Sequence, residues 1–245
     1  MIRMFIGSSS KGEDADIEMA YEHSLRENCS EEIEIEWMRQ SDDPNSYWGC
    51  WETHTWPTPF SGFRWGIPEF CNFEGRAIYT DCDMINFRDI KELWETDLEG
   101  KPIAARKGQR FGGHEFCVMV IDCAKMKDIG ILIPKQRMMK ISESHQRYIY
   151  TFSGQSHHVK DLDPRWNVLD GEDKKFEEMY QLHFTNMATQ PWCPQWYTGE
   201  RKGHPRQDVN ELYYKKVAEA KIAGKEPYLP GKDYPTLKEY NIIGR

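Results

Sequence analysis

Asp-x-Asp triplets occur three times in the chain and are the first candidates for chemistry. The triplets lie at residues 14–16, 81–83 and 161–163. On an extended chain, side chains at i and i+2 point the same way with their backbones about 7 Å apart, so both carboxylates can reach one hard divalent cation. Residues 14–16 fall at the predicted start of a helix, where acidic side chains interact favourably with the helix dipole. Residues 161–163 precede Pro164, which indicates a turn.

Asp81 and Asp83 directly follow an apolar segment at residues 77–80, which predicts a buried strand. Open α/β sheets bind ligands at the carboxyl ends of their strands. Because two buried carboxylates without a partner are costly, we expect a cation or a basic group beside them. A solvated loop is the alternative, and the strand before the pair favours a metal site.

His183 is the candidate for a third ligand. A single histidine is by default a core residue whose ring nitrogens are satisfied by neighbours. Here an apolar residue, the histidine and a polar loop are followed by Pro191 and Trp192. This combination favours a ligand role for His183 over the default role of a core histidine.

The elements that must position these residues alternate between strands and helices. Residues 2–6 predict a buried strand, followed by a loop at 7–12, a helix with an apolar face between Ile17 and Leu25, and a half-exposed strand at 32–37. This order favours a parallel sheet with helices on its faces. The further predicted elements are helical turns at 68–70 and 89–94, strands at 76–80 and 116–121, and a helix that opens with a capping box at 208–211 and stops at Gly224.

Composition limits the classes of protein that the chain can belong to. The 245 residues carry a net charge of −8, which argues against a nucleic-acid partner, because phosphate binding needs a basic field. A local basic stretch at residues 101–110 is interpreted as a solvated loop. No apolar run approaches the ~20 residues of a membrane span, and the apolar N-terminus is too short for a signal peptide. We therefore expect a cytoplasmic protein without an integral membrane segment, and the seven scattered cysteines predict reduced thiols.

Four segments together resemble the retaining glycosyltransferases of family 8, the glycogenin and bacterial galactosyltransferase type. Residues 75–84 with 90–94 are similar to the family's Asp-x-Asp segment, and residues 183–192 to its closing motif of a His, a glycine loop and Lys-Pro-Trp. Residues 117–122 resemble its central Gly-Val-Met-Leu-Ile-Asn strand, and residues 60–64 its arginine segment. The resemblance covers about residues 1–196.

The resemblance implies an α/β fold of the GT-A type, with a mostly parallel central sheet and helices on both faces. Residues 1–198 would form this nucleotide-sugar-binding domain, and the helix and tail at 199–245 would pack on it. The implied activity is transfer of a sugar, with retention, from a nucleoside-diphosphate sugar to a hydroxyl of a glycan or glycoconjugate, with UDP as the expected nucleotide. A sugar-nucleotide pyrophosphorylase (nucleotidyltransferase) and a non-catalytic carbohydrate-binding module are the alternatives.

The family's functional residues map onto matching positions of this chain. Asp81, Asp83 and His183 would hold Mn²⁺, with Mg²⁺ as the alternative ion, and Asp81, Asp83 and Arg64 would form the catalytic group. Arg64 would also contact the donor. The remaining donor contacts would be Gly7, Ser8, Ser9, Cys82, Asn186, Gln190 and Trp192.

The chain departs from the family at defined places. Gln190 stands where the family has the lysine of its closing motif, and residues 115–117 replace an Asn-x-Gly-like turn. Residues 142–146 occupy the region of the family's Asp-Gln-Asp segment without matching it. The Trp-rich residues 41–62, which hold Trp48, Trp51 and Trp56, are predicted to form the acceptor side, because sugar rings stack on aromatic faces; core packing is the alternative.

Overall fold

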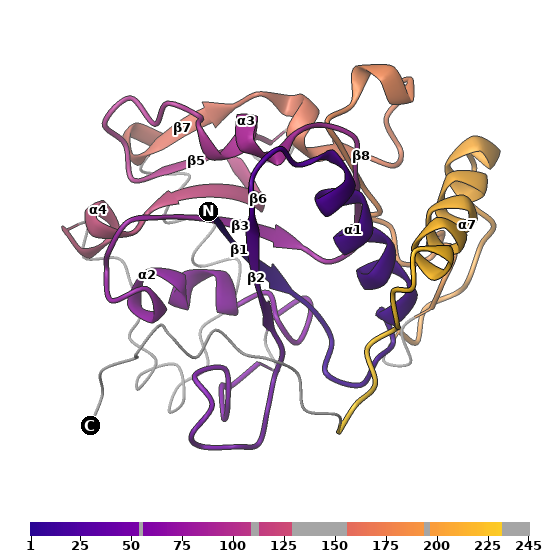
Figure 1. Ribbon diagram of the computed structural model, residues 1–245, viewed down its shortest axis with the longest axis horizontal. Helices are drawn as coiled ribbons and strands as arrows, with labels where there is room; N and C mark the ends of the chain where they lie inside the picture. The colour runs from indigo at the N-terminus through magenta and orange to yellow at the C-terminus, as the bar shows by residue number, and fades with distance from the viewer. Residues whose placement is uncertain (54–55, 109–112, 129–155, 194–196, 232–245) are drawn as a thin grey trace.

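A six-stranded sheet forms the centre of the protein (Figure 1). The structure is a computed structural model that describes residues 1–53, 56–108, 113–128, 156–193 and 197–231. The strands lie in the order β2-β1-β3-β6-β5-β7. Pairs β1–β2, β1–β3 and β5–β7 are parallel, and β6 runs antiparallel to both β3 and β5. Their bounds are Ile2–Gly7 (β1), Ile33–Met38 (β2), Arg76–Asp81 (β3), Ile103–Lys107 (β5), His114–Asp122 (β6) and Val159–Leu162 (β7).

A small second sheet adjoins the carboxyl end of β3. It contains β4 (Met84–Asn86), β9 (Gln181–His183) and β8 (Val168–Leu169), in the order β4-β9-β8. Strand β4 is antiparallel to β9, with Met84 opposite His183. The second sheet therefore joins two segments about a hundred residues apart in the chain.

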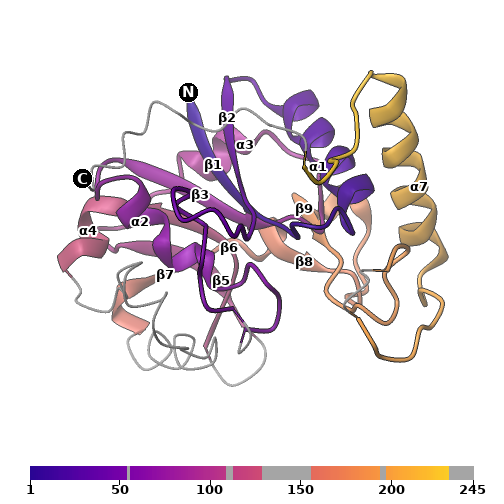
Figure 2. The ribbon, with the colours of Figure 1, turned by 90° about the horizontal axis from the view of Figure 1, so that it is seen from below.

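Two long helices pack against each other at one side of the molecule, and two short helices lie at the other side (Figures 1 and 2). The long helices are α1 (Ala15–Asn28) and α7 (Gln207–Ile222), and the short ones are α2 (Ile67–Phe70) and α4 (Cys123–Asp128). Helix α1 is buried on two faces, because Tyr21 and Leu25 join the core of the central sheet while Ile17 and Ala20 pack with Val209 of α7. The other helices among the described residues are α3 (Ile90–Trp94) and four short 3-10 segments, η1 (Phe63–Gly66), η2 (Ser156–His158), η3 (Pro164–Asn167) and η4 (Phe176–Glu178).

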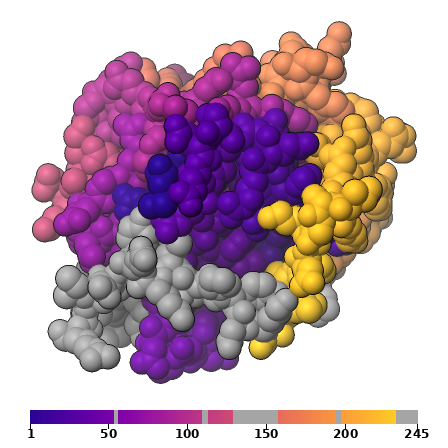
Figure 3. All heavy atoms as spheres, in the orientation of Figure 1, coloured from indigo at the N-terminus to yellow at the C-terminus, as the bar shows by residue number. Residues whose placement is uncertain are grey.

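The C-terminal part of the described chain lies against the N-terminal part, as the yellow and indigo surfaces of Figure 3 show. Beyond α7, Tyr228 donates a hydrogen bond to the carbonyl of Ser10 at 3.4 Å. A Cβ on Gly12 would lie 3.2 Å from Pro230. The division into residues 1–198 and 199–245 stays a prediction, and residues 232–245 lie outside the described residues.

Most predicted elements are present, and three local predictions are wrong. Residues 161–163 do not form a turn, because Asp161 belongs to β7 and Asp163 caps η3 by accepting from the backbone N–H of Arg165. Helix α7 begins after Arg206 without a side-chain cap, so the capping box at 208–211 does not form. The basic stretch at 101–110 is not a solvated loop, since residues 103–107 are β5 and Arg106 is only 4% exposed. Gly224 does follow the end of α7, with a φ of 76° that favours glycine.

The tryptophans of residues 41–62 belong to the core. Trp48, Trp51 and Trp56 are 3%, 3% and 6% exposed, and Trp48 stacks on Phe70 with ring centroids 5.3 Å apart. The indole N–H of Trp48 donates to Glu36 at 2.8 Å. The prediction that these rings form an acceptor surface is wrong, because the rings pack in the core and are not exposed for a sugar to stack on. Within the described residues, no helix is long and apolar enough to cross a membrane.

Candidate active site

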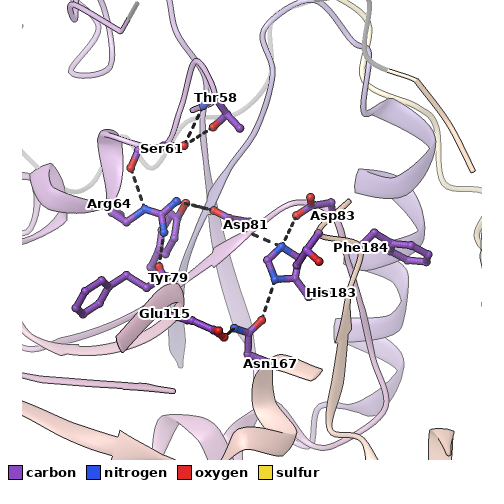
Figure 4. Close-up of polar contacts among 12 residues, drawn as sticks. Thr58, Ser61, Arg64, Tyr79, Asp81, Asp83, Glu115, Asn167, His183 and Phe184 are labelled. Atoms are coloured by element: carbon purple, nitrogen blue, oxygen red, sulfur yellow. Dashed lines mark hydrogen bonds and ion pairs between the residues drawn. The ribbon is translucent and has the colours of Figure 1, made fainter. Parts of the chain in front are cut away.

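The site forms where β3 ends and the small sheet begins (Figure 4). Asp81 is the last residue of β3, and Asp83 directly precedes β4. The backbone N–H of Phe184 donates to the carbonyl of Asp83 at 2.9 Å. Because Met84 pairs with His183 in the same ladder, backbone pairing alone brings the histidine to the two aspartates.

The Nε2 atom of His183 faces both carboxylates. It lies 3.2 Å from Oδ1 of Asp83 and 3.9 Å from Oδ2 of Asp81. On the other side of the ring, Nδ1 lies 2.8 Å from Oδ1 of Asn167. The amide nitrogen of Asn167 in turn donates to Glu115 at 3.3 Å. A carboxylate only accepts hydrogen bonds, so this pairing turns the amide oxygen towards the ring.

Asn167 therefore fixes how His183 is protonated. Its oxygen accepts from Nδ1–H, so a neutral ring would carry its lone pair on Nε2 and present it to an ion bound beside the two aspartates. Metal-binding histidines are held in this way, with the second ring nitrogen donating to a fixed acceptor. Asn167 was not among the predicted site residues, because no sequence motif marks it. It lies directly before the short strand β8, which pairs with β9.

The charges at the site are strongly coupled. Burial raises the pKa of Asp83, against the attraction of His183. Burial also lowers the pKa of His183, but the charge and hydrogen bond of Asp83, together with Asp81, outweigh it and the net pKa is raised. Two half-buried carboxylates thus face one imidazole, and a divalent cation bound there would offset their negative charge.

Asp81 is held from the side opposite to His183. Nη2 of Arg64 lies 3.0 Å from Oδ1 of Asp81, and the hydroxyl of Tyr79 donates to the same oxygen. Arg64 also donates to the carbonyls of Ser61, at 2.8 Å, and Phe116, and is 3% exposed. Arg64 therefore positions Asp81, and its contact with a donor stays a prediction.

The closing segment approaches Asp83 and the start of α1. The side-chain amide of Gln190 donates to Asp83 at 3.3 Å and to the carbonyl of Phe184 at 2.7 Å. The indole of Trp192 donates to Asp14, the residue before α1, at 2.8 Å. Burial raises the pKa of Asp14 to about 6, and the charge of Asp83 contributes to the shift. Asp14, from the first of the three triplets, thus lies near the site, which the sequence analysis did not predict.

The predicted donor residues that end or follow β1 and β3 are buried. Gly7 packs so closely that a Cβ there would lie 2.8 Å from the ring of Phe60. Ser8 donates to the buried Glu18. Cys82 is 1% exposed, and burial raises the pKa of its thiol. Contacts of Gly7, Ser8, Ser9 and Cys82 with a nucleotide stay predictions that would depend on their backbone.

A cavity of about 690 Å³ lies beside the histidine and the small sheet. Asn186, a predicted donor residue, is among the residues that line it. Carboxylates dominate the polar part of the wall, and Arg106 beneath it pairs with Glu115 at 3.6 Å and with Glu172. The lining residues are Glu115, Cys117, Asn167, Leu169, Asp170, Gly171, Glu172, Thr185 and Asn186.

The donor set fits a divalent cation. Carboxylate oxygens and an imidazole nitrogen are ligands that suit Mn²⁺, and Nε2 of His183 lies within 4 Å of a carboxylate oxygen of both Asp81 and Asp83. The ligand atoms that all lie within 4.8 Å of one another in the described residues are those of Asp81, Cys117 and His183. A ligand role for Asp83 therefore stays a prediction. The predicted region at 142–146 lies outside the described residues.

The mixed α/β sheet with its covering helices has the fold of GT-A glycosyltransferases of known structure. The chain is similar to the glycosyltransferase GlyE of Streptococcus pneumoniae, with a TM-score of 0.60, 16% identity, and coverage of 92% of this chain and 64% of GlyE. It is also similar to the galactosyltransferase LgtC, solved with donor and acceptor sugar analogs, with a TM-score of 0.58, 11% identity, and coverage of 89% of this chain and 96% of LgtC.

Mouse xyloside xylosyltransferase 1 is a further similar structure, with a TM-score of 0.51, 11% identity, and coverage of 75% of this chain and 97% of that one. The chain spans 64% of GlyE and 51% of the bifunctional glycosyltransferase WbbM. No family model and no curated protein matches the sequence. The fold is therefore that of GT-A glycosyltransferases, as the sequence predicted.

Proposed function

We propose that the protein is a metal-dependent glycosyltransferase that uses a nucleoside-diphosphate sugar, with UDP as the expected nucleotide and Mn²⁺ as the expected ion. One observation carries the proposal: Nε2 of His183 lies 3.2 Å from Asp83 and 3.9 Å from Asp81, and Asn167 fixes its other ring nitrogen. Together with the fold, this geometry supports an ion-binding site at the end of β3.

The residues around the proposed ion have two roles: they hold Asp81 in place and they offset negative charge. Arg64 and Tyr79 bind one oxygen of Asp81 and leave Oδ2 directed towards His183. Arg64 also offsets part of the negative charge that would otherwise oppose a diphosphate at the site. A bound Mn²⁺ would supply a Lewis acid for the diphosphate that leaves the sugar.

The cavity beside His183 supports the sugar half of the proposal. Its volume of about 690 Å³ is within the range of small-molecule sites. Its wall offers carboxylates and the amide of Asn186, which can hydrogen-bond sugar hydroxyls. Retention of the anomeric configuration is proposed from the resemblance to family 8, and the acceptor is proposed to be a hydroxyl of a glycan or glycoconjugate.

Thermal unfolding with Mn²⁺ and nucleotide tests the donor site. We expect UDP with Mn²⁺ to raise the Tm of the wild type but not that of Asp83→Ala. Asp16→Ala is the matched control, because Asp16 belongs to another triplet and pairs at the surface with Lys221 at 3.1 Å. If neither UDP nor GDP with Mn²⁺ stabilises the wild type, the donor-site proposal is wrong.

Hydrolysis of a panel of nucleotide sugars tests the reaction. A glycosyltransferase is expected to release nucleoside diphosphate and free sugar slowly. Formation of nucleoside triphosphate from a nucleotide sugar and pyrophosphate would instead indicate a pyrophosphorylase. NMR of the anomeric proton of the transfer product tests retention.

A further inference from the structure

Cys117 lies across the sheet from Asp81. In the antiparallel pairing of β3 with β6, Thr80 lies opposite Val118, and Asp81 and Cys117 are the next residues along the two strands. Cross-strand partners in an antiparallel pair extend to the same face of the sheet. The ligand atoms of Cys117, Asp81 and His183 accordingly lie within 4.8 Å of one another.

Cys117 is also half-buried and belongs to the wall of the 690 Å³ cavity. It is a free cysteine. An ion bound by Asp81 and His183 would therefore have a sulfur atom within reach on the cavity side.

We propose that Cys117 is a ligand of the metal ion held by Asp81 and His183, and that it turns the site towards ions that bind sulfur, such as Zn²⁺ and Co²⁺. This inference rests on the metal site of the proposed function. On binding, the S–H bond breaks, a sulfur–metal bond forms and the proton passes to solvent. Thiolate sulfur suits Zn²⁺, whereas Mn²⁺ prefers oxygen ligands. A sulfur ligand from Cys117 would therefore raise the affinity of the site for Zn²⁺ relative to Mn²⁺.

The affinity ratio of two ions measures the contribution of the sulfur. Loss of a hydrogen-bond partner of a ligand already costs about 10–100-fold in metal affinity. We therefore expect Cys117→Ser to weaken Zn²⁺ binding at least about tenfold, with a much smaller effect on Mn²⁺. Cys29→Ser is the matched control, because Cys29 is also a half-buried free thiol but lies at the far end of α1.

Titration of the metal-free protein with Co²⁺ gives a direct readout of the sulfur bond. We expect the wild type and Cys29→Ser to develop a sulfur-to-cobalt charge-transfer band in the near ultraviolet. Cys117→Ser is expected to bind Co²⁺ without this band, and Asp81→Asn to lose most of its Co²⁺ affinity. In the wild type, Zn²⁺ is expected to slow alkylation of Cys117 by iodoacetamide, measured by peptide mass spectrometry.

The outcomes separate this inference from the proposed function. An unchanged charge-transfer band in Cys117→Ser, or alkylation of Cys117 that Zn²⁺ does not slow, would overturn the inference. If the same protein is still stabilised by UDP with Mn²⁺, the proposed function stands. If the wild type binds none of the three ions, the metal site and this inference both fail.

Discussion

Asn167 allows the metal site to be tested without changing a ligand. Its oxygen lies 2.8 Å from Nδ1 of His183, and its amide donates to Glu115 at 3.3 Å. Leucine has a similar size but accepts and donates no hydrogen bond. In Asn167→Leu, the ring of His183 is no longer held in the form that presents the Nε2 lone pair to an ion beside Asp81 and Asp83.

The size of the effect follows from these two contacts. Loss of a hydrogen-bond partner of a metal-binding histidine costs about 10–100-fold in metal affinity, which corresponds to about 1.4–2.8 kcal/mol. The buried Nδ1–H also loses its acceptor, which costs about 1–3 kcal/mol of folding stability. We therefore expect Asn167→Leu to bind Mn²⁺ at least about tenfold more weakly than the wild type.

Isothermal titration of the metal-free protein with Mn²⁺ measures the affinity, and urea unfolding in EDTA measures the stability. Asn86→Leu is the matched control, because Asn86 is equally buried at 0% exposure and its amide binds the carbonyl of Arg88 at 2.7 Å instead of the histidine. The control should lose stability but keep its Mn²⁺ affinity. If Asn167→Leu binds Mn²⁺ as tightly as the wild type, the assignment of the ring nitrogens is wrong.

Three further substitutions test the charges and the packing around the site. Burial raises the pKa of Asp14 to about 6, so the contribution of Asp14 to stability in EDTA should fall as the pH rises from about 4 to about 6. Asp14→Asn should therefore be more stable than the wild type by up to about 3 kcal/mol at pH 8 and by much less at pH 4. Urea unfolding of both proteins across this range checks the sign, and a difference independent of pH would refute it. Gly7→Ala should lose about 1–3 kcal/mol by overpacking, because its Cβ would lie 2.8 Å from Phe60; an unchanged Tm would contradict this. Arg64→Met should lose about 1–3 kcal/mol in EDTA, since it leaves the half-buried Asp81 without its 3.0 Å partner, and Mn²⁺ should restore part of the loss. Equal stability with and without the arginine would exclude this role.

Local patterns were sufficient for most of the secondary structure. The period-two alternation at 32–37 and the apolar run at 116–121 correspond to β2 and β6, because both patterns are typical of extended chain. The alternation did not predict the burial of Glu36 in β2. The patterns failed where tertiary contacts decided the environment. Arg106 lies in a basic stretch but is buried, because Glu115 and Glu172 neutralise it.

The aromatic residues show the same limit. A tryptophan has the same local signal whether it stacks on a sugar or on Phe70, and the choice depends on what else packs there. Residues 41–62 therefore led to a wrong acceptor prediction, although core packing was the stated alternative.

By itself, the sequence determined that Asp81 and Asp83 follow a buried strand, that His183 precedes a closing segment and that the fold is of the GT-A type. These conclusions need only chain-local patterns and a resemblance in motif. The tertiary structure decided which groups surround them: Asn167 on the histidine, Arg64 on Asp81 and Cys117 across the ladder. The reason is physical, since strand pairing and burial bring together residues that are far apart in the chain, and no local pattern records the partner that each one meets.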